Sequence, residues 1–269
     1  MQRDDSSKIS ERKETMMLND DEIRLQKRFA ELAEKSYQQN IYFFTDFLGL
    51  GEQTLFHQVR RQFAHVPCTM FGGHEACERV MVRFGSADMM GYEEDFPIVC
   101  LEIRPAAPKF AEALGHRDYL GALINLGIER SVMGDIFVAE KGAYVYCLDT
   151  MADYICENLS KVKHTIVACR QVEQIPEEAL PRLVERTVNV ASERLDVILA
   201  AVYNLSRNQA LELFRAGKVF VGGRLYENNS GQPKEGDVIS LRGFGRFVYG
   251  GVTYETKKGR YMVRVQVYQ

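Results

Sequence analysis

A pair of capped helices followed by a hairpin, within residues 192–246, constrains the fold of this chain more than any other segment. Ser192 is a suitable N-cap for a first helix, whose apolar stripe consists of Leu195, Ile198, Leu199 and Val202. Ser206 begins the second helix, and Gln209 three residues later completes a capping box. Gly217 ends that helix. The strand-like runs that follow, at 218–223 and 236–242, predict a hairpin.

Arginines stand at both predicted helix starts. We expect Arg194 in the first turn of the first helix and Arg207 in the first turn of the second, each beside backbone N–H groups that lack a helical acceptor. Such positive helix ends suit phosphate groups, so the segment predicts an RNA-binding surface. Asp196 is expected to be the partner of a basic residue rather than a catalyst. The candidate RNA-binding residues are Arg194, Arg207, Asn208, Arg215, Lys218, Arg224, Arg242 and Arg246.

The distribution of charge supports this location. The whole chain has a formal net charge of −3, which by itself is unusual for a nucleic-acid-binding protein. Residues 192–269, however, contain 12 Lys and Arg against 7 Asp and Glu, so the acidic surplus lies entirely in the preceding part. This asymmetry indicates a basic module on an acidic carrier.

Composition excludes several other classes of protein. The longest apolar run, 197–205, is far shorter than the ~20 residues of a membrane span, and residues 1–8 lack the apolar core of a secretory signal. The cysteines are scattered and form no C-x-x-C pair, which predicts reduced thiols in a reducing, cytoplasmic compartment. The histidines show no metal-ligand spacing. We therefore expect no metal, no cofactor and no membrane association.

The rest of the chain divides into an N-terminal region and a middle domain. We expect a mobile tail at 1–19 and a helical region at 20–75, with helices from about Asp20 and from 51 to 64. Residues 76–173 follow the order β-α-β-β-α-β of ferredoxin-like and RRM-like domains. Segment 174–181 is predicted to be a linker, because two prolines and two acidic residues interrupt every periodic pattern, and the basic domain is expected at 182–269.

Two tyrosines on one predicted strand of the middle domain leave two roles open. Tyr144 and Tyr146 alternate as base-stacking residues on an RRM-like sheet would. A role in the core or in cross-strand packing fits the same pattern equally well.

Residues 192–246 resemble the S4-type RNA-binding domain, departing from its common pattern at Gly223 in the turn. Upstream, the run from His116 to Arg130 followed by Gly134-Asp135-Ile136 resembles the signature of the bacterial YlmH family, and the resemblance covers about residues 20–269. It implies an α+β chain with a helical N-terminal region, an RRM-like βαββαβ middle domain and a C-terminal S4-type (αL) domain. It also implies association with rRNA and tRNA on the large ribosomal subunit, in rescue of stalled ribosomes, and a second role in cell division.

The sequence contains few signs of a catalytic site. The run His116-Arg117-Asp118 imitates a kinase catalytic loop, but the accompanying kinase motifs are missing. No catalytic motif of an RNA pseudouridine synthase or methyltransferase is recognisable, so we expect no catalytic residue. The leading hypothesis is a monomeric, non-enzymatic RNA-binding factor. An RNA-modifying enzyme with an unrecognised catalytic domain, and a cell-division adaptor that binds partner proteins, remain alternatives.

Overall fold

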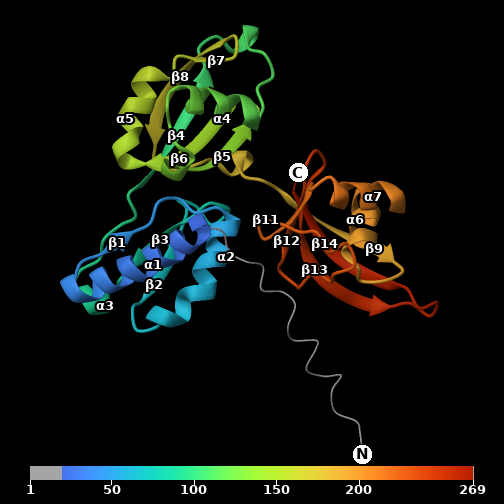
Figure 1. Ribbon diagram of the computed structural model, residues 1–269. Coiled ribbons are helices and arrows are strands. Elements are labelled where there is room, and N and C mark those ends of the chain that lie inside the picture. Colours follow the sequence, from blue (N-terminus) through green and yellow to red (C-terminus); the bar gives the residue numbers. More distant parts are fainter. Residues whose placement is uncertain (1–19, 269) are drawn as a thin grey trace, which may run out of the picture.

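The computed structural model describes residues 20–268, so the tail expected at residues 1–19 lies outside the described residues. The chain forms three modules that follow one another along the sequence, each with its own apolar core (Figure 1). All three combine helices with strands, which confirms the predicted α+β class.

The N-terminal module packs two helices against a small sheet. Its helices are α1 Asp20–Gln39, α2 Leu50–Val59, the 3-10 helix η1 Arg60–Phe63 and the short α3 Ala87–Met90. Its strands, in the spatial order β1-β3-β2, are β1 Phe43–Phe44, β2 Cys68–Phe71 and β3 Met81–Phe84. The inward face of α2 and η1 is formed by four buried residues, Leu55, Phe56, Val59 and Phe63.

Three expectations for this module need correction. The region is not purely helical, because β1, β2 and β3 form a three-stranded antiparallel sheet beneath the helices. Strand β3, which lies beyond the boundary expected near residue 75, belongs to this sheet. The predicted helix 51–64 is also shorter, since its last turn is a 3-10 helix. We propose that the N-terminal module extends to about residue 97.

The middle module has the predicted β-α-β-β-α-β order, with one short additional strand. Its elements are β4 Ile98–Pro105, η2 Pro108–Phe110, α4 His116–Asn125, η3 Arg130–Val132, β5 Met133–Ala139, β6 Gly142–Leu148, α5 Asp149–Asn158, β7 Lys161–Val162 and β8 Thr165–Val172. The five-stranded antiparallel sheet has the order β5-β6-β4-β8-β7, which is the ferredoxin-like arrangement extended by β7. Residues of α4 and α5 pack on one face of this sheet, where Leu101, Leu123, Val145 and Ile155 are fully buried.

The opposite face of the middle sheet is covered by other parts of the same chain. Tyr144 and Tyr146 lie there with exposed fractions of only 6% and 4%. They form an apolar cluster with Ile175 and Ala179, which come from the segment predicted to be a linker and its 3-10 helix η4 Glu177–Ala179. Packing rather than base stacking is therefore the role of both tyrosines in this structure, and the segment 174–181 is a docked strap rather than a free linker.

The C-terminal module contains the two predicted helices and a six-stranded antiparallel sheet. Its elements are β9 Leu183–Val190, α6 Leu195–Tyr203, α7 Arg207–Arg215, β10 Val219–Val221, β11 Arg224–Leu225, β12 Val238–Leu241, β13 Gly245–Glu255 and β14 Tyr261–Tyr268. The strands lie in the order β11-β10-β12-β13-β14-β9. Strand β9, the first of the module in sequence, forms one edge of the sheet and pairs with β14 along its whole length. The apolar stripe of α6 packs on this sheet and completes the core.

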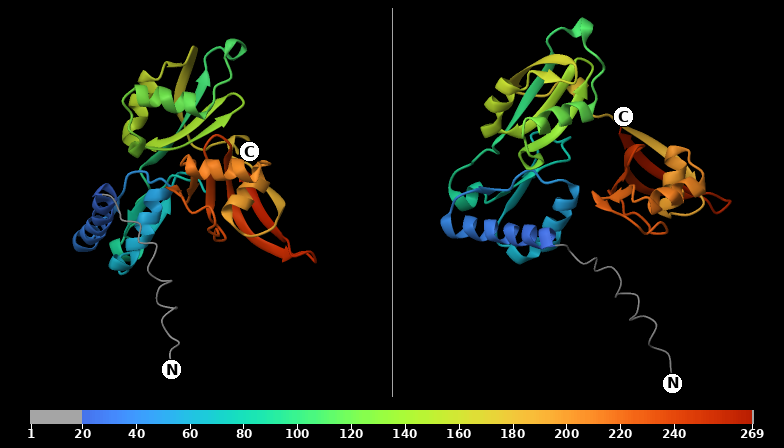
Figure 2. Two further views of the ribbon diagram at one scale, coloured as in Figure 1. Left: turned by 45° about the vertical axis from the view of Figure 1, so that its right-hand side comes forward. Right: turned by 45° about the horizontal axis from the view of Figure 1, so that its top comes forward.

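The side chain of Arg79 ties the N-terminal and middle modules together. Its guanidinium donates to the backbone carbonyls of Phe47, Arg130 and Met133 at 2.8–2.9 Å. The carboxylate of Asp135 in β5 accepts the backbone N–H groups of Glu78 and Arg79 at 2.5 and 2.8 Å. These contacts, from a loop of one module to the strand edge of the next, fix the two bodies seen side by side in both views of Figure 2.

Candidate nucleic-acid interface

The start of α7 has the geometry that the sequence predicts. Ser206 caps the helix, accepting the N–H of Gln209 at 3.2 Å, while the Gln209 side chain accepts the Ser206 N–H at 2.8 Å. Arg207 and Asn208 occupy the first turn and are exposed. Within residues 20–268, the backbone N–H groups of these two residues have no acceptor. The positive end of α7 is thus open to an anion.

The start of α6 differs from the prediction. The N-cap is Arg194 rather than Ser192, so Arg194 precedes the first turn instead of lying within it. The N–H groups of Leu195 and Asp196 donate to the carbonyls of Gly231 and Asn229 at 2.9 and 3.1 Å. The loop between β11 and β12 therefore fills this helix end. The expectation of free N–H groups at the start of α6 is wrong.

A buried carboxylate holds the Arg194 side chain. Asp196 is fully buried and accepts two hydrogen bonds from the Arg194 guanidinium, at 3.0 and 2.8 Å, and one from the Val197 N–H at 3.0 Å. The hydrogen bonds and charge of Asp196 raise the pKa of Arg194. This confirms Asp196 as the helix-side partner of a basic residue, and it shows that part of the Arg194 charge is already neutralised.

The cations that remain open lie along α7 and just after it. The four cations Arg207, Arg215, Lys218 and Arg242 are exposed, and so is the neutral Asn208. In the described part of the chain no carboxylate forms an ion pair with any of these four cations. The backbone N–H of Arg242 donates to the Lys218 carbonyl at 3.0 Å, which brings both residues to the same edge, and the Arg242 guanidinium lies 4.4 Å from the Phe220 ring centroid. We call this surface, formed by Arg207, Asn208, Arg215, Lys218 and Arg242, the α7 face.

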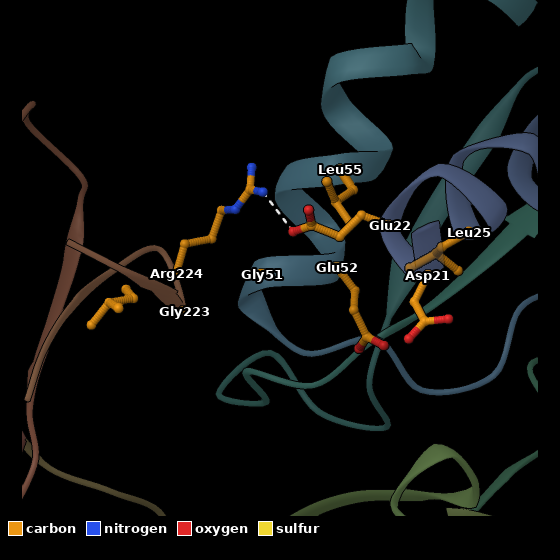
Figure 3. A pocket seen from close by; sticks show the side chains of 9 residues that line it. Asp21, Glu22, Leu25, Gly51, Glu52, Leu55, Gly223 and Arg224 are labelled. Atoms are coloured by element: carbon orange, nitrogen blue, oxygen red, sulfur yellow. Dashed lines mark hydrogen bonds and ion pairs between the residues drawn. The ribbon is translucent and has the colours of Figure 1, made fainter. Parts of the chain in front are cut away.

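The last two candidates turn toward the N-terminal module instead. Arg224 pairs with Glu22 of α1 at 2.6 Å, and Arg246 pairs with Glu78. Figure 3 shows the Arg224 side chain extending to the carboxylate of Glu22, at a pocket of about 550 Å³ that Asp21 and Glu52 also line. Sequence reasoning missed both partners, because Glu22 and Glu78 lie far away in the chain and no local pattern marks them.

The turn between β10 and β11 fits closely against α2. Gly223 has a φ of +77°, and a Cβ atom there would lie 2.6 Å from the Gly51 nitrogen and 2.7 Å from the Leu50 Cβ. Only glycine combines that left-handed conformation with so close an approach. The departure from the common S4-type pattern at Gly223 therefore coincides with a contact between modules.

Metal ligands, cysteine thiols and long apolar helices bear on other kinds of site. Residues 20–268 contain no cluster of three or more His, Cys, Asp or Glu side chains arranged to hold a metal ion. Burial raises the pKa of the Cys68 and Cys100 thiols to about 11, so both are protonated at neutral pH and poorly nucleophilic. None of the helices that the structure describes is both long and apolar enough to span a bilayer.

Comparison with known proteins agrees with this geometry. A family model described as "Putative RNA-binding domain in YlmH" matches residues 92–175, and one described as "S4 domain" matches residues 193–239. A relative from Bacillus subtilis (strain 168), "Ribosome-associated protein quality control protein P2", is 30% identical over 234 residues, which cover 86% of this chain and 88% of the relative. The chain belongs to the YlmH family.

Membership of the YlmH family confirms the resemblance seen in the sequence and assigns the two matched modules. The open cations of the α7 face lie within or directly beside the S4 match. A solved structure, "Cell division protein ylmH from Streptococcus pneumoniae", is 23% identical with a TM-score of 0.47, covering 59% of this chain and 95% of that chain.

Proposed function

We propose that this protein is a monomeric, non-enzymatic RNA-binding factor that acts in the cytoplasm on the large ribosomal subunit, where peptidyl-tRNA remains after stalling. The observation that carries the proposal is the α7 face. It combines exposed cations with the open N–H groups at the start of α7, inside an S4 domain.

The α7 face suits the RNA backbone better than base edges. Arg207 and the free N–H groups beside it can hold one phosphate, while Arg215, Lys218 and Arg242 lie at the other end of a nine-residue helix, about 13 Å away. Cations spaced in this way can contact separate phosphates of a structured RNA, and such contacts position a protein without reading sequence. Binding should therefore depend steeply on salt concentration.

The ribosome is the proposed partner for two reasons. The relative from Bacillus subtilis is named as a ribosome-associated quality control protein, and it aligns with this chain over most of both lengths. The acidic surplus of residues 1–191 also disfavours indiscriminate RNA binding, which is appropriate for a factor that recognises one assembled RNA surface.

Sedimentation with purified ribosomal subunits, followed by crosslinking and sequencing of the attached RNA, tests the proposal. We expect the protein to travel with the large subunit and to crosslink to rRNA and tRNA through the C-terminal module. Absence from both subunits, with capture of cell-division proteins instead, would favour the adaptor alternative. Mass spectrometry of rRNA and tRNA from a deletion strain addresses the enzyme alternative, because a missing modification would reveal catalysis.

A further inference from the structure

A cluster of cations lies where the three modules meet, outside the α7 face. It consists of Arg79, His116, Arg117, Arg130 and Arg246, and we call it the junction cluster. Arg79, His116 and Arg130 line one small cavity together with Asp135. Arg246 of the C-terminal module and Arg117 are close enough to affect the ionisation of His116. Three modules thus contribute positive charge to one place.

The carboxylates near this cluster are already engaged. Glu78 pairs with Arg246, and Asp135 accepts two backbone N–H groups. Glu52 accepts the Gly49 N–H at 2.6 Å. His116, Arg117 and Arg130 are exposed, and in the described part of the chain neither Arg117 nor Arg130 forms an ion pair with a carboxylate.

Like charges held together in this way repel one another. The protein atoms around the His116 imidazole reduce its solvation, and together with the nearby guanidinium of Arg130 they lower the pKa of His116, although the residue as a whole is exposed. Burial and the same guanidinium lower the pKa of Arg79. An anion placed among these groups would relieve the repulsion, and a phosphodiester is the anion that an RNA-binding protein meets most often.

The junction cluster gives the middle module a surface for RNA other than its covered sheet face. The sheet face that RRM-like domains use for base stacking is covered by the strap 174–181, so that route is closed in this structure. His116 and Arg117 of the junction cluster are the first residues of α4, which packs on the other face of the sheet. Arg246 belongs to the same six-stranded sheet as the strands following α7, and its guanidinium lies 4.1 Å from the Tyr268 ring centroid.

We propose that the junction cluster binds the phosphate backbone of the RNA that the S4 domain holds, so that one RNA crosses from the C-terminal module onto the start of α4. The inference rests on the proposed function, since it requires that the protein binds RNA. It adds a second contact, on the middle module, made by exposed Arg117 and Arg130 together with His116.

The test uses the full chain and a fluorescein-labelled RNA stem-loop with a single-stranded tail, measured by anisotropy over a series of salt concentrations. The variant Arg117→Ala/Arg130→Ala removes two exposed cations of the cluster and leaves Arg79, which joins the modules, in place. The matched control, Arg61→Ala/Lys141→Ala, removes two exposed cations elsewhere. We expect the cluster variant to bind about tenfold more weakly, with the log–log salt slope shallower by about 1–2, and the control to match the wild type.

A second readout locates the RNA at the cluster. Bound phosphate should raise the pKa of the His116 imidazole, measured by NMR titration of the wild type with and without saturating RNA. A cluster variant that matches the control in affinity and slope, or a His116 pKa that RNA leaves unchanged, would overturn the inference. The variant Arg207→Ala/Lys218→Ala is confined to the α7 face. If this variant loses affinity while the cluster variant does not, the inference fails and the proposed function stands. A wild type that itself binds no RNA would refute the proposed function.

Discussion

Arg207 and Arg194 differ in what surrounds each guanidinium, and this difference decides what each can do. Arg194 forms a two-point ion pair with the fully buried Asp196. A buried carboxylate that loses its cation is strongly unfavourable, so this pair supports the fold. Arg207 is exposed beside two open backbone N–H groups and can bind a phosphate without giving up a protein partner. A contribution of Arg194 to RNA binding stays a prediction.

Substitution at the two positions should therefore separate stability from binding. Arg194→Ala should lower the melting temperature, because Asp196 is left buried with only the Val197 N–H and a long contact to Asn229. Arg207→Ala should melt like the wild type and weaken RNA binding by about 1–3 kcal/mol, the value of a charge-assisted contact. Thermal melting and RNA titration of both variants make the comparison. Equal melting temperatures for the two variants would contradict the assignment of roles.

At the scale of helices and strands, local patterns were predictable and distant pairings were not. The cap at Ser206 and the β-α-β-β-α-β order of the middle module follow from short-range periodicity, and the structure confirms both. The pairing of β3 with β1 and β2, and of β9 with β14, depends on which strands meet in space. The candidate site shows the same division. The exposed cations of the α7 face could be predicted from the local sequence pattern. The loop 229–231, which covers the start of α6, could not, because it lies more than 30 residues further along the chain.

The C-terminal module should act as an independent RNA-binding unit. Its core is formed almost entirely by residues of β9 to β14, α6 and α7, so a fragment of residues 182–269 should fold. We expect it to bind structured RNA with a log–log salt slope of about −3 to −5, because several phosphates are neutralised. Filter binding at increasing salt concentration measures the slope. A slope near zero would argue against backbone recognition.

At the scale of the whole molecule, acidic residues of the N-terminal module engage two basic residues of the C-terminal module. The pairs Arg224–Glu22 and Arg246–Glu78 are only partly exposed, and the contact of Gly223 with α2 lies beside the first. RNA that uses these arginines must compete with the two carboxylates. The chain is therefore more than a set of independent modules, since its N-terminal part sets how much positive charge the S4 domain presents.

The variant Glu22→Gln/Glu78→Gln should bind RNA more tightly than the wild type, by about threefold to tenfold, because both arginines are released and two negative charges are removed. Burial raises the pKa of Glu78, so its carboxyl takes up a proton at a higher pH than an ordinary glutamate and its pairing with Arg246 weakens as pH falls. The advantage of the variant should accordingly shrink in mildly acidic buffer. Anisotropy titrations at neutral and mildly acidic pH test this, and an affinity no higher than that of the wild type would refute competition.

The central claim is that the α7 face binds ribosomal RNA, and pelleting with large ribosomal subunits tests it most directly. The comparison is between the wild type, Arg207→Ala/Lys218→Ala and the control Arg61→Ala/Lys141→Ala, with thermal melting confirming that all three are folded. We predict that the wild type and the control pellet with the subunit while the α7-face variant stays in the supernatant. A folded α7-face variant that pellets like the wild type would show that the protein uses a different surface.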